Sequence, residues 1–454
     1  MTKAASHKPR RSKDRHAPET NTLPLLATTL DVLARVLEFE RPADAVLSYT
    51  FRNDPQMGSH DRAFIAEAVY GVLRRLRGLQ TIAAPATPRR LLLAWLARHG
   101  GINMRQFEGA VKDDELSWLK EMKAADLSTQ PEAVRLELPD WLHERLRARF
   151  GDHLPALAEA LNRPAPLDLR VNTVKMARDA VLHMFTTEGI AVAATPYSPL
   201  GLRLQGKPAL QKHPMFIEGG VEVQDEGSQL LGLLLAPKRG EMVCDFCAGA
   251  GGKTLLLGAL MANTGRLYAY DVSEKRLNNM KPRLARSGLS NVHPQLIAHE
   301  RDPKIKRLAG KFDRVLVDAP CSGLGTLRRN PDLKWRQSPE SLLELTAKQA
   351  AILESAARLV KSGGRLVYAT CSLLEEENEA IVQAFLAAHP DFHLVPAGEV
   401  LAAQNIALAA ESLAALPPYE SGVPLAGKMG DTLRLDPAIH NTDGFFAAVL
   451  ERQA

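Results

Sequence analysis

The chain has 454 residues, of which 45% are hydrophobic and 24% are charged, close to the values of an average globular protein. This composition excludes collagen-like, low-complexity and wholly disordered chains, and a length of 454 residues favours about three domains. No run reaches the roughly 18 uncharged apolar residues of a membrane-spanning helix, and no signal-peptide cleavage pattern is present, so we expect a soluble, cytoplasmic protein.

The first residues of the chain form a basic arm. Residues 1–16 contain six lysines and arginines against one aspartate, which accounts for the whole formal net charge of +5. Such arms bind phosphate backbones, although a solvated tail has the same composition. We expect residues 1–20 to be disordered.

Residues 21–145 are expected to form an all-helical domain. Apolar residues recur at helical spacing between Leu26 and Val36, and again between Phe64 and Leu73. Arginines flank the second stripe at positions 62, 74, 75 and 77.

A small α+β segment is expected over residues 146–225. The sequence Asn162-Arg-Pro-Ala-Pro166 has the composition of a linker. Short apolar runs at 167–171 and 201–204 are typical of strands.

From residue 226 to the C-terminus, short apolar strands alternate with helices. Strands are predicted at 242–246, 266–271, 292–297, 314–318 and 365–370, and the clearest helix at 339–361. This alternation predicts parallel strands joined by right-handed crossovers, a doubly wound, Rossmann-like α/β sheet. Ligands of such sheets bind at the carboxyl ends of the strands.

A glycine-rich loop follows the first of these strands, over Cys247-Ala-Gly-Ala-Gly-Gly-Lys253. Its backbone N–H groups and the helix that starts at about Thr254 can approach a ligand closely. The loop fits neither the P-loop nor the dinucleotide fingerprint, because Cys247 and Thr254 occupy positions that need glycine.

The second strand ends in Asp271, nineteen residues after Gly252. A carboxylate at about this distance commonly accepts hydrogen bonds from ribose hydroxyls, although an ordinary strand-end aspartate looks the same. A ribose without a tight pyrophosphate site favours S-adenosylmethionine over NAD.

Four cysteines in a chain of this length argue against a disulfide scaffold and for a reducing compartment. Cys244 and Cys247 form a C-x-x-C, which could be a redox pair or half of a zinc site. Zinc would need two further ligands at short spacing, and Cys321 and Cys371 each stand alone. We therefore expect no metal.

Cys321 and Cys371 follow the fourth and fifth predicted strands of the α/β domain. A lone cysteine there would most simply be a small buried hydrophobic residue. Two at the carboxyl ends of strands in one sheet, on the side of the glycine loop, favour a role as covalent nucleophile.

Three motifs carry a family resemblance: Cys-Ala-x-x-Gly-Gly-Lys-Thr at 247–254, Asp-Ala-Pro-Cys-Ser-Gly at 318–323 and Ala-Thr-Cys-Ser at 369–372. Together they resemble the Nop/Sun RNA cytosine-5 methyltransferases, and among them the ribosomal RNA enzymes with a NusB-like helical domain. Residues 61–75 look like that NusB-like domain, and 170–173, 223–226, 328–335 and 443–446 match further family segments.

The resemblance implies methyl transfer from S-adenosylmethionine to carbon 5 of a cytosine in RNA, most simply 16S ribosomal RNA. It implies that Cys371 attacks carbon 6, that Cys321 assists release of the product, and that Asp318 holds the base edge with Lys253 close by. The cofactor would lie on Cys247, Ala248, Gly249, Ala250, Gly251, Gly252, Lys253, Asp271 and Asp318, and on an acid after the third strand.

Two departures from the family pattern bear on these residues. Ala250 stands where the family often has proline, which loosens the loop but keeps its glycines. The usual Gly-Asp after the third strand is absent, so Glu300 is the expected adenosine-contacting acid and Asp302 the second choice.

Other functions remain open at this point. The same chemistry could act on transfer RNA, or the chain could be a non-catalytic RNA-binding assembly factor with an inactive methyltransferase domain. A DNA cytosine methyltransferase is disfavoured, because that class uses a Pro-Cys nucleophile without the Thr-Cys-Ser strand end. We expect no membrane partner, and the sequence does not indicate an oligomeric state.

Overall fold

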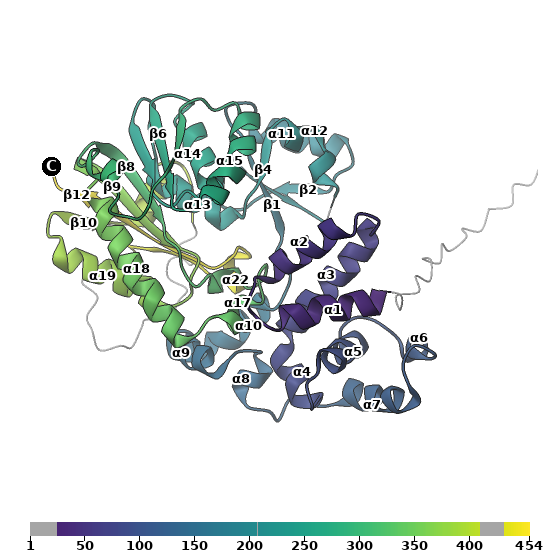
Figure 1. Ribbon diagram of the computed structural model, residues 1–454. Helices are drawn as coiled ribbons and strands as arrows, with labels where there is room; N and C mark the ends of the chain where they lie inside the picture. The colour runs from purple at the N-terminus through teal and green to yellow at the C-terminus, as the bar shows by residue number, and fades with distance from the viewer. Residues whose placement is uncertain (1–24, 207, 409–430) are drawn as a thin grey trace, which may run out of the picture. The chain divides into compact units, whose positions relative to one another are not determined.

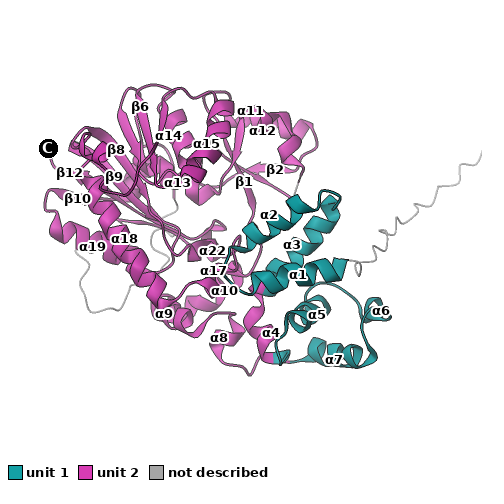
Figure 2. Ribbon diagram, in the orientation of Figure 1, with its two compact units in different colours: residues 1–72, 82–125 teal, residues 73–81, 126–454 magenta. Residues whose placement is uncertain are grey.

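The computed structural model describes residues 25–206, 208–408 and 431–454 (Figure 1). The predicted basic arm, residues 1–20, lies outside the described residues. The chain divides into two compact units, residues 1–72 with 82–125 and residues 73–81 with 126–454 (Figure 2).

The first unit is helical. Its helices are α1 (Leu26–Val36), α2 (Ala43–Asn53), most of α3 (Ser59–Arg74), α5 (Pro88–Arg98), α6 (Met104–Phe107) and α7 (Asp113–Ala124). The two predicted apolar stripes are confirmed as helices α1 and α3, with Val32, Val36, Ile65 and Val69 fully buried. The similarity of this unit to NusB stays a prediction.

The second unit begins with short helices and a small antiparallel sheet. The helices are α4 (Leu76–Ile82), α8 (Glu132–Arg135), α9 (Asp140–Phe150), α10 (Leu154–Leu161), α11 (Arg178–Thr187) and α12 (Pro214–Ile217). The strands lie in the order β2 (Val192–Ala194), β3 (Gly201–Leu204), β1 (Leu167–Val171), β4 (Val221–Val223). The two predicted strands are confirmed as β1 and β3, and apolar residues of the sheet pack on Val181 and Phe185 of α11.

The described residues of the second unit also form a larger sheet of eight strands. Parallel strands β5 (Met242–Asp245), β6 (Arg266–Asp271), β7 (Val292–Leu296), β8 (Phe312–Asp318) and β9 (Val360–Thr370) confirm the predicted alternation. The prediction was incomplete after residue 370. Strand β12 (Phe445–Arg452) pairs antiparallel with β9, and β10 (Phe392–Val395) and β11 (Leu433–Leu435) pair antiparallel with β12, so the sheet is mixed.

Helices cover both faces of the larger sheet (Figure 1). They are α13 (Glu226–Leu235), α14 (Gly252–Leu260), α15 (Glu274–Ser287), α16 (Pro303–Lys306), α18 (Pro339–Ala357), α19 (Glu379–Ala388) and α20 (Ala397–Ala402). The same unit also contains the short helices α17 (Leu333–Arg336) and α22 (Pro437–His440). Helix α18 ends four residues before the predicted end, at 361, because Val360 pairs with Phe312 and starts β9.

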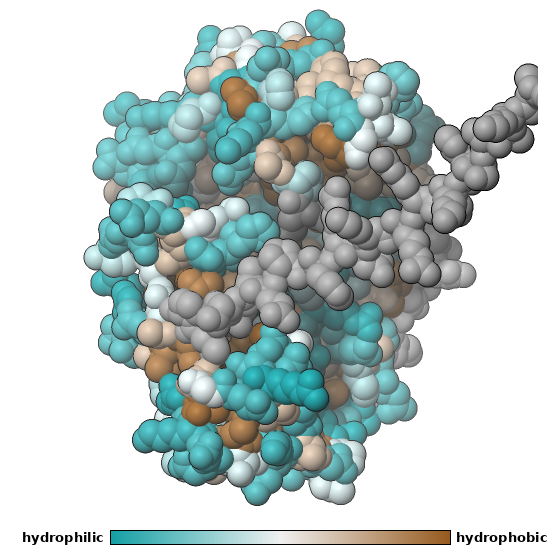
Figure 3. Space-filling view, turned by 90° about the vertical axis from the view of Figure 1, so that its right-hand side faces the viewer, coloured by the Kyte–Doolittle hydropathy of each residue, from teal (hydrophilic) through white to brown (hydrophobic). Residues whose placement is uncertain are grey.

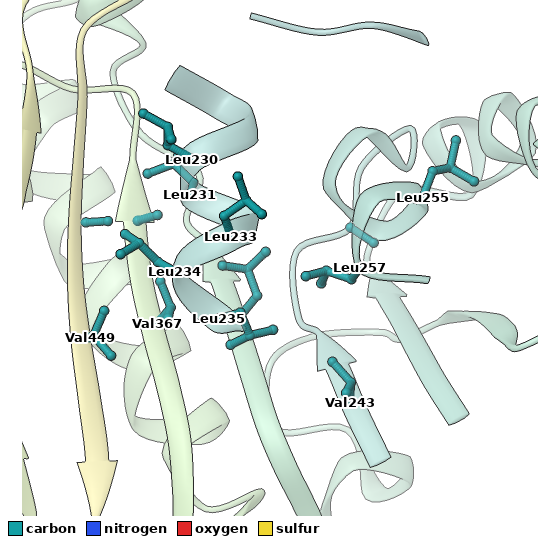
Figure 4. Close-up of a cluster of buried hydrophobic side chains, with 14 of the residues drawn as sticks. Leu230, Leu231, Leu233, Leu234, Leu235, Val243, Leu255, Leu257, Val367 and Val449 are labelled. Carbon is teal, nitrogen blue, oxygen red and sulfur yellow. The ribbon is translucent and has the colours of Figure 1, made fainter. Parts of the chain in front are cut away.

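Alternate residues of β9 enter two separate cores. Val367 and Ala369 pack with the leucines of α13, whereas Leu366 and Tyr368 pack with Leu353 of α18. Helix α13 carries leucines around its circumference and lies against β9, β12 and α14 (Figure 4). Burial on both faces fixes the register of the strands, because a shift by one residue would exchange the two cores.

The described surface is mostly hydrophilic on the face seen in Figure 3, with hydrophobic residues scattered among hydrophilic ones. Within the described ranges, no helix is both long and apolar enough to cross a membrane.

Candidate active site

A cavity of about 580 Å³ lies at the carboxyl ends of the central parallel strands. The predicted residues that line it are Cys247, Ala248, Gly249, Ala250, Gly252, Lys253, Asp271, Glu300, Asp318, Cys321 and Cys371. Gly251 is the exception among the predicted site residues. The tertiary fold therefore gathers residues spread over more than a hundred positions into one concave site of the size that small ligands occupy.

The glycine loop between β5 and α14 needs two of its glycines for different reasons. Gly249 and Gly251 have positive φ angles of 56° and 85°, which favour glycine. A Cβ on Gly251 would lie 2.6 Å from Cγ of Met280, so this residue faces the core and lets the loop pack against Met280 of α15. Gly251 thus shapes the loop instead of lining the cavity.

Asp271 ties the loop to the end of β6. Its Oδ2 accepts a hydrogen bond from Gly249 N at 2.8 Å and its Oδ1 accepts one from Ser273 N at 2.7 Å. A carboxylate has about four acceptor sites, so Asp271 can hold the loop closed and still accept from ribose hydroxyls.

The small sheet holds the same loop from the other side. Arg170 of β1 donates to the carbonyl oxygen of Gly252 at 2.6 Å, and Arg283 of α15 donates to that of Ala250 at 2.7 Å. Glu222 of β4 accepts from Arg283 at 2.9 Å and from Arg286 at 2.6 Å. The loosening expected from alanine at position 250 is thus opposed by two arginines that hold loop carbonyls.

Lys253 and Asp318 form an ion pair in the cavity, with Nζ 2.7 Å from Oδ2. Burial acts to lower the pKa of Lys253, but the charge and hydrogen bond of Asp318 outweigh it and the pKa is raised. The side chain is therefore a permanent ammonium.

Asp245, at the end of β5, is a site residue that the sequence analysis missed. It is buried, lines the cavity and accepts from Thr254 Oγ1 at 2.7 Å, while its Oδ1 has no hydrogen-bond partner among the described residues. Burial raises the pKa of Asp245 to about 7. Its position at the end of a predicted strand, directly before the glycine loop, is the sequence feature that could have identified it as a site residue.

The two predicted cysteines meet at the floor of the site, with their Sγ atoms 3.4 Å apart. The hydrogen bond with Cys371, together with burial, raises the pKa of Cys321 well above its usual value. Cys321 therefore holds its proton at neutral pH.

Of the two acids considered after β7, Glu300 lines the cavity. The second choice, Asp302, instead caps α16, where it accepts from Ala298 N at 2.9 Å and from Lys304 N at 2.8 Å. Its carboxylate is thus committed to a local turn.

The C-x-x-C motif is split between the core and the cavity. Cys244 is fully buried in the sheet, whereas Cys247 lines the cavity, and burial raises the pKa of both thiols. No group of three or more His, Cys, Asp or Glu side chains that could hold a metal ion occurs within residues 25–206, 208–408 and 431–454.

Comparisons with known proteins agree with this architecture. A family model described as 16S rRNA methyltransferase RsmB/F matches residues 232–451, and one described as the RsmF/B-like ferredoxin-like domain matches residues 138–211. Ribosomal RNA small subunit methyltransferase B of Sodalis glossinidius is 33% identical over 374 residues, which cover 76% of this chain and 86% of that protein. The probable enzyme of the same name from Synechocystis is 34% identical over 374 residues, covering 74% and 83%.

Two solved structures extend the likeness. That of PH0851 matches with a TM-score of 0.75 and 28% identity over 95% of this chain and 99% of its own. A methyltransferase homolog from Pyrococcus horikoshii matches with a TM-score of 0.60 and 31% identity, covering 70% and 97%. With these matches and the motifs of the cavity, the chain belongs to the RsmB/F family of methyltransferases.

Proposed function

We propose that this protein transfers a methyl group from S-adenosylmethionine to carbon 5 of a cytosine in ribosomal RNA, through a covalent adduct with Cys371. The observation that carries the proposal is the pair of sulfurs 3.4 Å apart on the floor of the cavity that the glycine loop lines. A second thiol is of use in a reaction that must both make and break a bond to sulfur.

The cavity residues fit S-adenosylmethionine. The unpartnered, buried Asp245 Oδ1 is an acceptor for the ammonium group, Asp271 and Glu300 are acceptors for the ribose and adenosine, and Ile297 supplies apolar surface. When bound, the cofactor would supply an electrophilic methyl group on a sulfonium.

Cys371 starts the reaction as the nucleophile. Its Sγ bonds to carbon 6, and the electron pair of the ring double bond moves toward carbon 5, which becomes an enamine carbon able to accept the methyl group. Lys253 lines the same cavity as Cys371, so its positive charge suits a site in which a thiolate attacks. The attack is assigned to Cys371 on the family resemblance of its Ala-Thr-Cys-Ser motif.

Cys321 acts in the release step. The proton on carbon 5 must leave, its bonding pair re-forms the ring double bond, and the bond from carbon 6 to Cys371 breaks with the electrons returning to sulfur. Cys321 lies beside the Cys371 sulfur and passes its proton to that departing sulfur, and the Cys321 thiolate, which has a high proton affinity, takes the proton from carbon 5. A reducing cytoplasm would keep both sulfurs available.

Asp318 is the proposed holder of the base. Lys253 occupies its Oδ2, and the remaining acceptor sites can take the exocyclic amine and a protonated ring nitrogen of cytosine. Holding the protonated ring makes carbon 6 more electrophilic. Arg276 and Lys348 are exposed at the rim of the cavity, where cations favour a phosphate backbone.

Bisulfite sequencing of ribosomal and transfer RNA from a deletion strain tests the proposal. We expect one cytosine of 16S ribosomal RNA to lose its 5-methyl signal and to regain it with the wild-type gene but not with Cys371→Ala. A loss of the signal confined to transfer RNA would identify transfer RNA as the substrate. No loss in either RNA would favour the non-catalytic assembly factor.

A further inference from the structure

A buried carboxylate, outside every predicted site, joins the two cysteine-bearing loops. Glu377 ends the short 3-10 helix at Glu375–Glu377 and has no exposed surface. Its Oε1 accepts from Ser322 N at 2.7 Å, and its Oε2 accepts from the hydroxyl groups of Ser322 and Ser372. Gln349 of α18 also donates to Oε1, at 2.9 Å.

The two serines are the immediate neighbours of the cysteines in sequence, Ser322 after Cys321 and Ser372 after Cys371. Their hydroxyl oxygens lie 3.2 Å apart, next to the carboxylate that both contact. One side chain therefore fixes the first residue beyond each sulfur. The loops are otherwise joined near the sulfurs by the hydrogen bond from Gly325 N to Cys371 O at 2.8 Å.

Glu377 is itself held in place. The hydroxyl of Tyr368 on β9 donates to its backbone carbonyl at 2.7 Å, and the next residue, Asn378, donates to Ser372 O at 3.0 Å. Gln349 also donates to Pro320 O at 3.0 Å, which ties the loop before Cys321 to the same group. The carboxylate is thus a fixed point from which both loops are positioned.

Burying a carboxylate is costly unless hydrogen bonds compensate it. Four donors converge on this one, and hydrogen bonds to charged groups are the strong ones. A packed apolar residue would fill the space as well, but it would leave Ser322 N without this partner and would remove the carboxylate that both loops contact.

We propose that Glu377 is a positioning residue, which sets the separation of the Cys321 and Cys371 sulfurs through Ser322 and Ser372. The expected loss of kcat rests on the two-cysteine reaction proposed above. The expected change in the separation of the sulfurs does not. Glu377 touches neither the cofactor-lining loop nor the sulfurs, so its loss changes the alignment of the thiols and leaves the cofactor site intact.

The alignment of the two sulfurs can be followed through the rate at which they form a disulfide. Diamide oxidises two thiols to a disulfide and takes up the two hydrogens, and the S–S bond of about 2.05 Å forms only where the sulfurs can meet. The rate of the Cys321–Cys371 bridge is followed by peptide mass spectrometry in wild type and Glu377→Gln, which keeps the side-chain shape. Glu376→Gln is the matched control, because Glu376 is half-exposed and pairs with Arg145 outside this cluster.

We expect Glu377→Gln to slow bridging at least about tenfold and to lower kcat by about 10- to 100-fold, since displacements near 1 Å cost on the order of 100-fold in rate. Its Kd for S-adenosylmethionine should stay within about twofold of wild type, a separation that general unfolding would not give. Ser322→Ala removes a single bond of the cluster and should show a smaller change in the same direction.

Equal bridging rates in wild type, Glu377→Gln and Ser322→Ala would overturn the proposal. So would a loss of cofactor affinity in proportion to the loss of kcat, because that pattern marks a collapsed fold. Bridging needs no RNA and no methyl transfer, so an inactive wild-type protein would reject the proposed function while the bridging rates still decide the role of Glu377.

Discussion

Cys321 Sγ lies 3.4 Å from Cys371 Sγ, although the two residues are 50 positions apart in the chain. They meet because β8 and β9 are parallel neighbours, with Asp318 opposite Ala369, so that the loops after both strands leave the sheet at the same edge. The arrangement makes the two sulfurs a pair with separable roles.

The two cysteine variants should differ in kind. Cys371→Ala should abolish methyl transfer and form no adduct, because no other thiolate reaches carbon 6, whereas Cys321→Ala should methylate once and remain attached to its RNA. Denaturing gels with and without nuclease distinguish the two outcomes. An adduct in the Cys371 variant alone would reverse the roles, and full turnover in both would leave the cysteines as buried hydrophobic residues.

Removing the Asp271 side chain should weaken cofactor binding. Asp271→Ala loses the ribose acceptor and the bond that closes the loop at Gly249, so we expect a loss of about 1–3 kcal/mol in the binding free energy of S-adenosylmethionine, measured by calorimetry. Asp302→Ala is the control, because Asp302 caps α16 outside the cavity. Unchanged affinity in a folded Asp271→Ala protein contradicts the assignment.

Cofactor affinity should depend on pH through Asp245. Burial raises the pKa of this carboxyl from its usual acidic range to about 7, so it is mostly neutral below pH 7 in the free protein. An ammonium group binds the ionised form, so binding releases a proton, and affinity should rise with pH by up to about tenfold per unit below pH 7 and level off above it. Titration calorimetry from pH 6 to 8 measures this dependence.

Asp245→Asn is the control for that titration. The amide cannot ionise, so its affinity should be lower above pH 7 and the pH dependence should flatten. Equal slopes in the two proteins would show that another group titrates on binding.

The link between the small sheet and the glycine loop should be measurable as cofactor affinity. Glu222→Gln weakens its pairing with Arg283 and Arg286 and frees the loop carbonyl of Ala250, so we expect about 1–2 kcal/mol of lost binding free energy. Glu218→Gln, an exposed neighbour in sequence, should bind as wild type does. If the two variants bind equally, the loop does not depend on the small sheet.

Local sequence determined the parallel strands and the contents of the loops at their ends. Four of the five parallel strands were recognisable because residues buried on both faces of a sheet form short, continuous apolar runs, whereas β7 has only one buried residue. Asp271, Glu300 and the glycine loop line one cavity because parallel strands bring their carboxyl ends to one edge, and their roles stay predictions. The same rule predicts that Cys321 and Cys371 lie on one edge of the sheet, since the parallel neighbours β8 and β9 end there.

Tertiary structure alone decided three other features. The antiparallel strand β12 lies far from its partner β9 in sequence, and its apolar run does not indicate which strand of the sheet it pairs with. Asp245 Oδ1 is buried without a hydrogen-bond partner among the described residues because the folded sheet covers it, and no local sequence pattern indicates this. Glu377 lies in a run of acidic residues that resembles a solvated turn. Packing instead buries its carboxylate, and hydrogen bonds from serine and glutamine side chains offset the cost of that burial. Glu377 is thus the common acceptor of both cysteine loops.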